Sequence, residues 1–401
     1  MTSGLTPSAP EPVEDRSGRS PWGAILAVYV AGVVAAAGFG KFASVGPSVA
    51  DDLGLSLPEL GWAISTVVGV GAVAGLPAGY LVRRVGAERS LVGGLVLIGA
   101  AGGAGAGSAG LGWLLAARGV EGVGYLLVTI ACPALTLRLA RERDRGVALS
   151  IWATFVPVGI GVSTLAGGVA GSVLGWRGWT ALVAGVTLVT ALALQVRPPR
   201  ASERPAAGSL PRAGALTWPG VLGASFCLMA LVTVPVVVLL PTLLVERYGR
   251  TAAAAGAWTS VVSLLGVVGG LAVGLLLRRG TPVGLVALLG LLAVPAAWLT
   301  YGTEGSAAAA VAGSAVISVQ NGLLGALVFA ALPLVLERLD HVDVGNGIVA
   351  QSGSLGALLG PPLFGAAADG WGLRSLALLI TAGTAGAVVS LLLASTRTTR
   401  R

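Results

Sequence analysis

Three charged side chains lie within long apolar stretches of this sequence, where water is scarce: Lys41, Arg118 and Glu121. Lys41 is the only lysine of the chain, and the other 24 of the 25 basic residues are arginine. A charge near the centre of a bilayer is unfavourable unless it is paired or faces water, so all three are candidate functional residues. Two cations against one carboxylate predict a site for a small anion bound by Lys41 and Arg118. Glu121 is the predicted proton carrier of that site.

The spacing of these residues places them at one depth. Arg118 and Glu121 are three residues apart, so they face the same way on a helix. At about 1.5 Å per residue, all three lie roughly 10–15 Å below the outer ends of their predicted helices. Two structural readings stay open. Lys41 can extend toward the outer interface near Asp51 or Asp52, and Arg118 with Glu121 can form an ion pair that only fixes helix packing.

Three polar amides also lie in apolar stretches, all in the second half of the chain: Gln320, Asn321 and Gln351. Exposing an amide to lipid is unfavourable, so these side chains are predicted to face a central cavity and to bind substrate. Three tryptophans can either line that cavity or pack between helices: Trp62, Trp152 and Trp258.

The composition shows what kind of element must position these residues. Of the 401 residues, 55% are hydrophobic and only 10% are charged, whereas soluble domains carry about a quarter charged residues. The net charge of +8 comes from arginines between apolar runs, which favours a membrane-orientation signal over nucleic-acid binding. Cys132 and Cys227 both fall in apolar runs, so no disulfide is expected. His341 lies in an acidic loop and is predicted to be solvated.

Apolar runs long enough to cross a bilayer, which takes ~20 helical residues, predict an all-α integral membrane protein with twelve transmembrane helices. The glycine series Gly71-Gly75-Gly79 and Gly266-Gly270-Gly274 are predicted to mediate helix packing. The twelve runs are 22–49, 59–82, 90–110, 112–137, 146–173, 178–196, 217–245, 253–277, 281–301, 306–336, 346–368 and 373–395.

The arginines between these runs predict the orientation. Nineteen lie in loops on the side of the termini and four lie in loops on the opposite side. By the positive-inside rule both termini are then cytoplasmic, in a multi-pass protein of the cell (inner) membrane.

An internal repeat predicts how the twelve helices are arranged. "GLPAGYLVRR" at 75–84 matches "GLAVGLLLRR" at 270–279 at six of ten positions. "EGVGYLLVTIACPALTLRL" at 121–139 matches 321–339 at seven of 19, which aligns Glu121 with Asn321. Two parallel six-helix repeats around a central cavity are therefore expected. The predicted units are a tail (1–21), a six-helix bundle (22–196), a Pro- and Arg-rich linker (197–216), a second bundle (217–395) and a tail (396–401).

The predicted loop after the second helix reads "GYLVRRVGAER". It is similar to a loop signature of the major facilitator superfamily, which it matches at Gly79, Leu81, Arg84 and Gly86, with Arg89 one place late. Arg83 stands where that family usually has an aspartate that helps to lock the cytoplasmic gate. The chain resembles this family over nearly its whole length. "RGVEGVG" at 118–124 resembles Arg-x-x-Gln-Gly-x-Gly, and "GALLGPPLFG" at 356–365 resembles the Gly-Pro motif of proton-coupled antiporters, which those proteins carry in their fifth helix. "SVGPSVADDLGLS" with "RRVGAER" looks most similar to the cyanate and nitroimidazole permease branch.

The resemblance and the embedded charges together predict a secondary transporter with alternating access for a small, anionic solute, with protons as the candidate coupling ion. Two alternatives stay open: an exporter of amphiphilic or drug-like compounds, and a non-transporting receptor on a carrier fold. No enzyme, cofactor or metal signature appears. The expected partners are a small-molecule substrate and membrane lipid, without nucleic acid, and the protein is expected to be a monomer.

Overall fold

The structure is a computed structural model that describes residues 20–42, 45–55, 57–199, 211–250, 252–302 and 305–398. Most of the predicted tails and of the linker 197–216 therefore lie outside the described residues. Within the described part, every regular element is a helix. Helices satisfy each backbone N–H and C=O internally, which a membrane-spanning segment requires.

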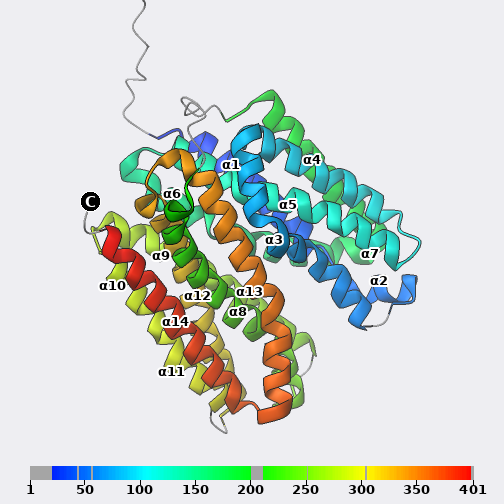
Figure 1. Cartoon of the computed structure of the whole chain (residues 1–401). Coiled ribbons are helices and arrows are strands. Elements are labelled where there is room, and N and C mark those ends of the chain that lie inside the picture. Colours follow the sequence, from blue (N-terminus) through cyan, green and yellow to red (C-terminus); the bar gives the residue numbers. More distant parts are fainter. Residues whose placement is uncertain are drawn as a thin grey trace, which may run out of the picture.

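The first seven helices form one group, the N-terminal helix group (Figure 1). Their buried apolar side chains share a core with part of the second half and form a smaller core of their own near Phe42 and Trp176. The helices are α1 (Trp22–Gly40), α2 (Gly46–Leu53), α3 (Leu57–Val85), α4 (Ala87–Ala106), α5 (Leu111–Leu139), α6 (Glu142–Trp152) and α7 (Phe155–Val196).

The remaining helices form the C-terminal helix group, in which α8 lies between α13 and α14 (Figure 1). The predicted run 281–301 is a chain of short helical pieces here, not a single regular helix. The elements are η1 (Ala213–Leu216), α8 (Thr217–Glu246), α9 (Ala252–Arg278), α10 (Val283–Leu288), η2 (Leu289–Leu292), α11 (Ala293–Ala297), η3 (Trp298–Gly302), α12 (Ala307–Val335), η4 (Leu339–His341), α13 (Val342–Trp371) and α14 (Arg374–Thr398).

Ten helical stretches in the described part are long and apolar enough to cross a membrane. One of them, Glu142–Val196, has 55 residues and contains the two predicted runs 146–173 and 178–196. The chain leaves helical geometry there at Gly175, with φ 68° and ψ 173°, a backbone conformation that glycine adopts without steric penalty. The helix α13 contains the predicted run 346–368 but is not among the ten.

The predicted run 22–49 is wrong as a single helix. The helix α1 ends at Gly40, and α2 is a separate short helix that begins at Gly46. The helix ends there because side chains from other helices donate hydrogen bonds to its last carbonyl groups.

The two groups meet through α3 against α13 and through α6 and α7 against α9. The predicted glycine packing is confirmed at these contacts. A Cβ on Gly79 would lie 2.9 Å from the Asp343 carbonyl oxygen, and a Cβ on Gly274 would lie 3.2 Å from Val147 Cα. Backbones approach this closely only where side chains are absent.

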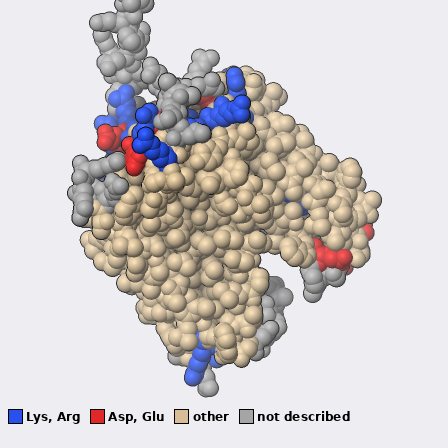
Figure 2. Space-filling model, viewed as in Figure 1, with Lys and Arg blue, Asp and Glu red and all other residues tan. Residues whose placement is uncertain are grey.

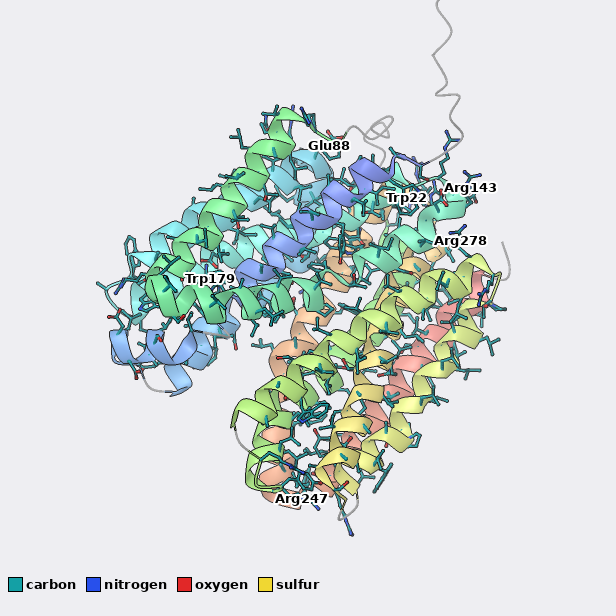
Figure 3. All side chains as sticks on the ribbon, turned by 180° about the vertical axis from the view of Figure 1, so that it is seen from behind. Trp22, Glu88, Arg143, Trp179, Arg247 and Arg278 are labelled. Atoms are coloured by element: carbon teal, nitrogen blue, oxygen red, sulfur yellow. The ribbon has the colours of Figure 1, made fainter. Side chains whose placement is uncertain are left out.

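We call the end of the molecule that carries Arg83, Arg138, Arg143, Arg278 and Arg338 the arginine-rich end. Arg143 and Arg278 lie together at this end, whereas Arg247 lies at the opposite end (Figure 3). Figure 2 shows a cleft between the two helix groups that opens away from the arginine-rich end. The groups are therefore joined at the arginine-rich end and separated at the other.

Candidate functional site

The three embedded charges form one ion-paired cluster. Lys41 Nζ donates to Glu121 Oε1 at 2.6 Å, and Arg118 Nη1 donates to Glu121 Oε2 at 2.5 Å. The structure confirms that Arg118 and Glu121 point the same way on α5, as their spacing predicts. The open reading in which Lys41 extends toward the outer interface near Asp51 or Asp52 is wrong, because Lys41 is buried and bonds to Glu121. Asp52 instead accepts hydrogen bonds from Trp176 and Arg177.

Side chains from other helices cap the end of α1 and so place Lys41. Arg118 donates to the carbonyl oxygens of Gly38 (3.2 Å) and Phe39 (3.1 Å), and Ser163 donates to that of Ala37 (3.0 Å). The last carbonyl groups of a helix have no partner within the helix, and a cation there is favourable. Arg118 therefore ends α1 just before Lys41.

Two further bonds fix the position of the cluster. Arg118 Nε donates to the Ala63 carbonyl oxygen on α3 at 3.0 Å, and Trp179 Nε1 donates to the Lys41 carbonyl oxygen at 2.9 Å. The ring of Phe42 lies 5.0 Å from the Arg118 guanidinium carbon and 5.5 Å from Lys41 Nζ. Cations at this distance from an aromatic face are stabilised by its quadrupole.

The cluster is enclosed by protein. Lys41, Arg118 and Glu121 are 1%, 0% and 2% exposed. On α4, Gly102 makes room, because a Cβ there would lie 3.2 Å from Lys41 Nζ and 3.4 Å from Glu121 Oε1. Buried charges persist where they are paired and hydrogen-bonded, yet this cluster keeps one positive charge in excess. In this conformation neither cation faces the cleft.

The three predicted amides take different positions. The Gln351 side chain spans the gap to α3, where Oε1 accepts from the Leu76 N–H at 2.9 Å and Nε2 donates to the Ala72 carbonyl oxygen at 3.1 Å. Gln320 is buried on α12. Asn321, its neighbour, has a buried Oδ1 that has no hydrogen-bond partner among the described residues.

The aromatic residues Phe39, Tyr125 and Phe155, in contrast to Trp152, were not singled out from the sequence. Phe39 lies 5.6 Å from Tyr125 between ring centroids, Tyr125 lies 6.5 Å from Phe155, and Phe155 stacks on Trp152 at 4.1 Å. In the C-terminal group, Phe226 and Phe329 meet edge to face at 5.5 Å. The sequence feature that could have pointed to them is the low aromatic content, which is only 5% of the chain.

The structure also shows the environment of the three tryptophans for which the sequence left cavity lining and packing both open. Trp152 is buried and packs on Gly32, where a Cβ would overlap its ring. Trp62 and Trp258 are exposed at 63% and 51%, so they do not pack in the core.

Two ion pairs join the helix groups at the arginine-rich end. Arg138 Nη2 lies 2.6 Å from Asp343 Oδ2, and Arg83 Nη2 lies 3.6 Å from Asp340 Oδ2. Arg83, which stands where the family signature has an aspartate, therefore meets an aspartate supplied by the other group. The remaining motif residues lie around this contact. Gly79 packs on α13, and Arg84 lies in the last turn of α3 with an exposed side chain. Gly86 has φ 102° between α3 and α4, and Arg89 is exposed on α4.

Asp340 carries further interactions at this end. Burial raises its pKa, but the Arg338 hydrogen bond and the charges of His341, Arg338 and Arg83 outweigh burial, so the pKa lies below its usual value. The prediction that His341 is solvated is wrong. Its side chain is buried, with Nε2 3.8 Å from Asp340 Oδ1.

Comparison with known proteins agrees with this architecture. Residues 28–361 match the family model described as Major Facilitator Superfamily. An uncharacterized MFS-type transporter of Mycobacterium tuberculosis is 34% identical over 160 residues, which is 40% of this chain. The human facilitated glucose transporter member 10 of solute carrier family 2 is 34% identical over 134 residues, which is 32% of this chain. The matches span 28% and 24% of the length of these two relatives.

Two solved structures share the fold. The human organic anion transporter MFSD10 has a TM-score of 0.75 at 15% identity, covering 92% of this chain and 98% of its own. The E. coli fucose:proton symporter FucP has a TM-score of 0.74 at 16% identity, covering 93% and 98%. Apolar helices of spanning length, a cleft between two helix groups and a family match over most of the sequence lead to one conclusion. This chain is a multi-pass membrane protein that belongs to the major facilitator superfamily.

Proposed function

We propose that this protein is a secondary active transporter that moves a small anionic solute by alternating access, with protons coupled through Glu121. The observation that carries the proposal is the buried cluster in which one carboxylate bridges two cations. The cleft on one side and the ion-paired contact on the other support a carrier whose arginine-rich end is closed (Figure 2).

The cluster suggests how proton and anion binding are coupled. Ionised Glu121 satisfies both Lys41 and Arg118, so an anion gains little by approaching them. Protonation of Glu121 removes that negative charge and leaves two cations in a site of low dielectric, which is unfavourable until another anion pairs with them. Each ligand then raises the affinity for the other, as thermodynamic linkage requires. One proton and one monovalent anion together carry no net charge.

Lys41 and Arg118 have different parts in this coupling. Arg118 also donates to three backbone carbonyl groups, so its position is fixed whether or not Glu121 is charged. Lys41 Nζ has Glu121 as its one hydrogen-bond partner among the residues that the structure describes. We therefore propose that Lys41 is the cation that turns toward a substrate, with Asn321 and Gln320 on α12 as its partners on the C-terminal side.

The proposal includes the finer architecture. Twelve spans would form two six-helix repeats, 22–196 and 217–395, with both termini in the cytoplasm of a monomeric inner-membrane carrier. Gly175 supports this arrangement because it divides the 55-residue stretch into two spans. Organic anion transport and proton symport are named functions of two proteins that share the fold, so both are compatible with it. Kinship with the cyanate and nitroimidazole permeases rests on the loop motifs alone.

An exporter of amphiphilic compounds is the second candidate. The aromatic contacts Phe39–Tyr125–Phe155 and Phe226–Phe329 favour it, since aromatic faces bind apolar and cationic ligands.

A ligand screen on the purified protein separates the two candidates. A ligand that binds the folded protein raises the unfolding midpoint, and the rise grows with the ratio of ligand concentration to Kd. For an anion–proton carrier, small monovalent anions raise the midpoint, and they do so more strongly at low pH. Stabilisation by amphiphilic cations, with no response to any small anion at any pH, would replace the first candidate with the second.

A further inference from the structure

We propose that Gln351 is a positioning residue for alternating access: its side-chain amide latches α13 into the backbone of α3 and holds the arginine-rich end closed. This inference rests on the proposed transport function. It concerns the conformational equilibrium, so it can be tested without a known substrate.

The first observation is a weak point in α3. Pro77 lies inside this helix. Proline has no N–H to donate to the carbonyl group four residues earlier, and its ring crowds the preceding turn. The turn just before it contains the Ala72 carbonyl and the Leu76 N–H, which are the two groups that bond to each other in a regular α-helix.

The second observation is that the Gln351 amide bonds to both of these groups. Oε1 accepts from Leu76 N at 2.9 Å and Nε2 donates to Ala72 O at 3.1 Å. A carboxamide carries an acceptor and donors side by side, so it can complement a C=O and an N–H at once. An ionised carboxylate has no donor and an ammonium has no acceptor, so neither can match both groups.

The third observation is the closeness of the two backbones at this point. A Cβ on Gly75 would lie 2.7 Å from Gln351 Cα, and one on Gly347 would lie 2.7 Å from the Gly75 carbonyl oxygen. One turn further along α13, the Cβ of Ser354 would lie 3.1 Å from a Cβ added to Gly71. Glycines on both helices therefore allow the Gln351 amide to reach the α3 backbone.

These observations give the contact two alternative states. With the amide inserted, α3 is held to α13 and the arginine-rich end is closed. When the helices separate, Leu76 N–H and Ala72 C=O can pair with each other as in a regular α-helix, so neither group is left unsatisfied. The amide is then free to meet water or substrate in the newly opened cleft. The latch is uncharged, in contrast to the ion pairs Arg138–Asp343 and Arg83–Asp340 at the same end.

The experiment measures the distance between spin labels across the arginine-rich end. Labels are attached to cysteines at Val85 on α3 and Leu339 on η4, both exposed, in a chain whose Cys132 and Cys227 are replaced by alanine. The unmodified latch should give mainly the short distance. Gln351→Leu keeps the bulk and removes both hydrogen bonds, so the ratio of long to short distances should rise about tenfold, the effect of two lost hydrogen bonds.

Three further variants make the test specific. Pro77→Ala restores the N–H and relaxes α3, so it should also favour the long distance. The double variant should add little to either single change, because both act on the same turn. Gln195→Leu, the same change at an exposed glutamine on α7 outside the contact between α3 and α13, should leave the distances unchanged.

The latch would be overturned if the ratio of long to short distances in Gln351→Leu stayed within about twofold of that in the unmodified protein. Such a change is too small for the loss of two hydrogen bonds. Asp343→Arg then tells which idea has failed, because it breaks the Arg138 ion pair without touching the amide. If Asp343→Arg opens the end and Gln351→Leu does not, the latch alone is wrong. If no variant yields the long distance, alternating access itself is contradicted.

Discussion

Glu121 is held between two cations that differ in how firmly they are fixed. Arg118 is bound to carbonyl groups of α1 and α3 and ends α1, so it is part of the scaffold as well as of the site. Lys41 depends on Glu121 for its charge-assisted bond. Arg118 therefore has a structural role and Lys41 is the adaptable cation. Substitutions at the two positions should separate these roles.

The first residue-scale prediction concerns Glu121→Gln. The variant cannot ionise but keeps the size and hydrogen-bonding shape of the side chain. Uphill uptake driven by a pH gradient should be abolished, while exchange of substrate across the membrane continues, since loading of the site no longer depends on a proton. Both are measured in proteoliposomes. Unchanged pH-driven uptake would leave Glu121 a packing role and require another coupling residue.

The second concerns Lys41. Lys41→Met removes the ammonium and leaves Glu121 paired with Arg118 as a neutral couple, so folding should survive while substrate binding weakens by about 2–5 kcal/mol. Lys41→Arg keeps the charge in a different shape and should retain part of the binding. Affinity is measured on the purified variants. If Lys41→Met binds as tightly as the unmodified protein, this lysine is only an anchor of α1.

At the scale of elements, the end of α1 depends on partners from α5 and α7. Ala37, Gly38 and Phe39 give their carbonyl groups to Ser163 and Arg118, so the short break before α2 is stabilised by tertiary contacts. In the membrane there is no water to replace a lost partner, and unsatisfied carbonyl groups are correspondingly unfavourable.

Arg118→Met should therefore affect folding more than Lys41→Met does. Glu121 keeps Lys41 as its partner, but the Gly38, Phe39 and Ala63 carbonyl groups lose their donor, for a loss of about 3–5 kcal/mol. Denaturant unfolding in detergent measures the difference, with Lys41→Met as the matched control. Equal stability of the two variants would mean that α1 ends at Gly40 for another reason.

The contact between α5 and α13 gives a charge-reversal prediction. Arg138 and Asp343 lie 2.6 Å apart across the two groups. Arg138→Asp alone places two carboxylates together and should open the arginine-rich end. Combining it with Asp343→Arg restores an ion pair and should restore the closed population, read from the same spin-label distances. A double variant as open as the single one would show that this pair does not hold the end closed.

At the scale of the whole molecule, the arginine-rich loops gather at one end and the cleft opens at the other (Figures 2 and 3). An outward-facing carrier has this form if the arginine-rich end is cytoplasmic, as the positive-inside rule predicts. The orientation then decides which side supplies both the substrate and the proton.

Cysteine labelling tests that orientation in intact cells. Ser202 and Thr303 lie outside the described residues, and Thr398 ends α14. Cysteines at Ser202 and Thr398 should react only with reagents that enter the cytoplasm, and a cysteine at Thr303 only with impermeant reagents outside. Labelling of Ser202 and Thr303 from the same side would contradict the twelve-span topology.

The sequence by itself determined the membrane character, the approximate positions of most helices, the family and the three embedded charges. These features follow from local composition and short motifs, because a run of ~20 apolar residues satisfies its own backbone as a helix wherever it lies. The i, i+3 pair of Arg118 and Glu121 is local in the same sense.

The tertiary structure decided which partners the side chains take. Lys41 meets Glu121 across 80 positions, and Leu76 meets Gln351 across 275. It also ended α1 at Gly40, buried His341 and brought Arg83 to Asp340. Apolar helices resemble one another, so composition does not reveal which faces pack together. That choice is made by close backbone approach at glycines and by the need to satisfy each buried polar group, and both are properties of the packed helices together.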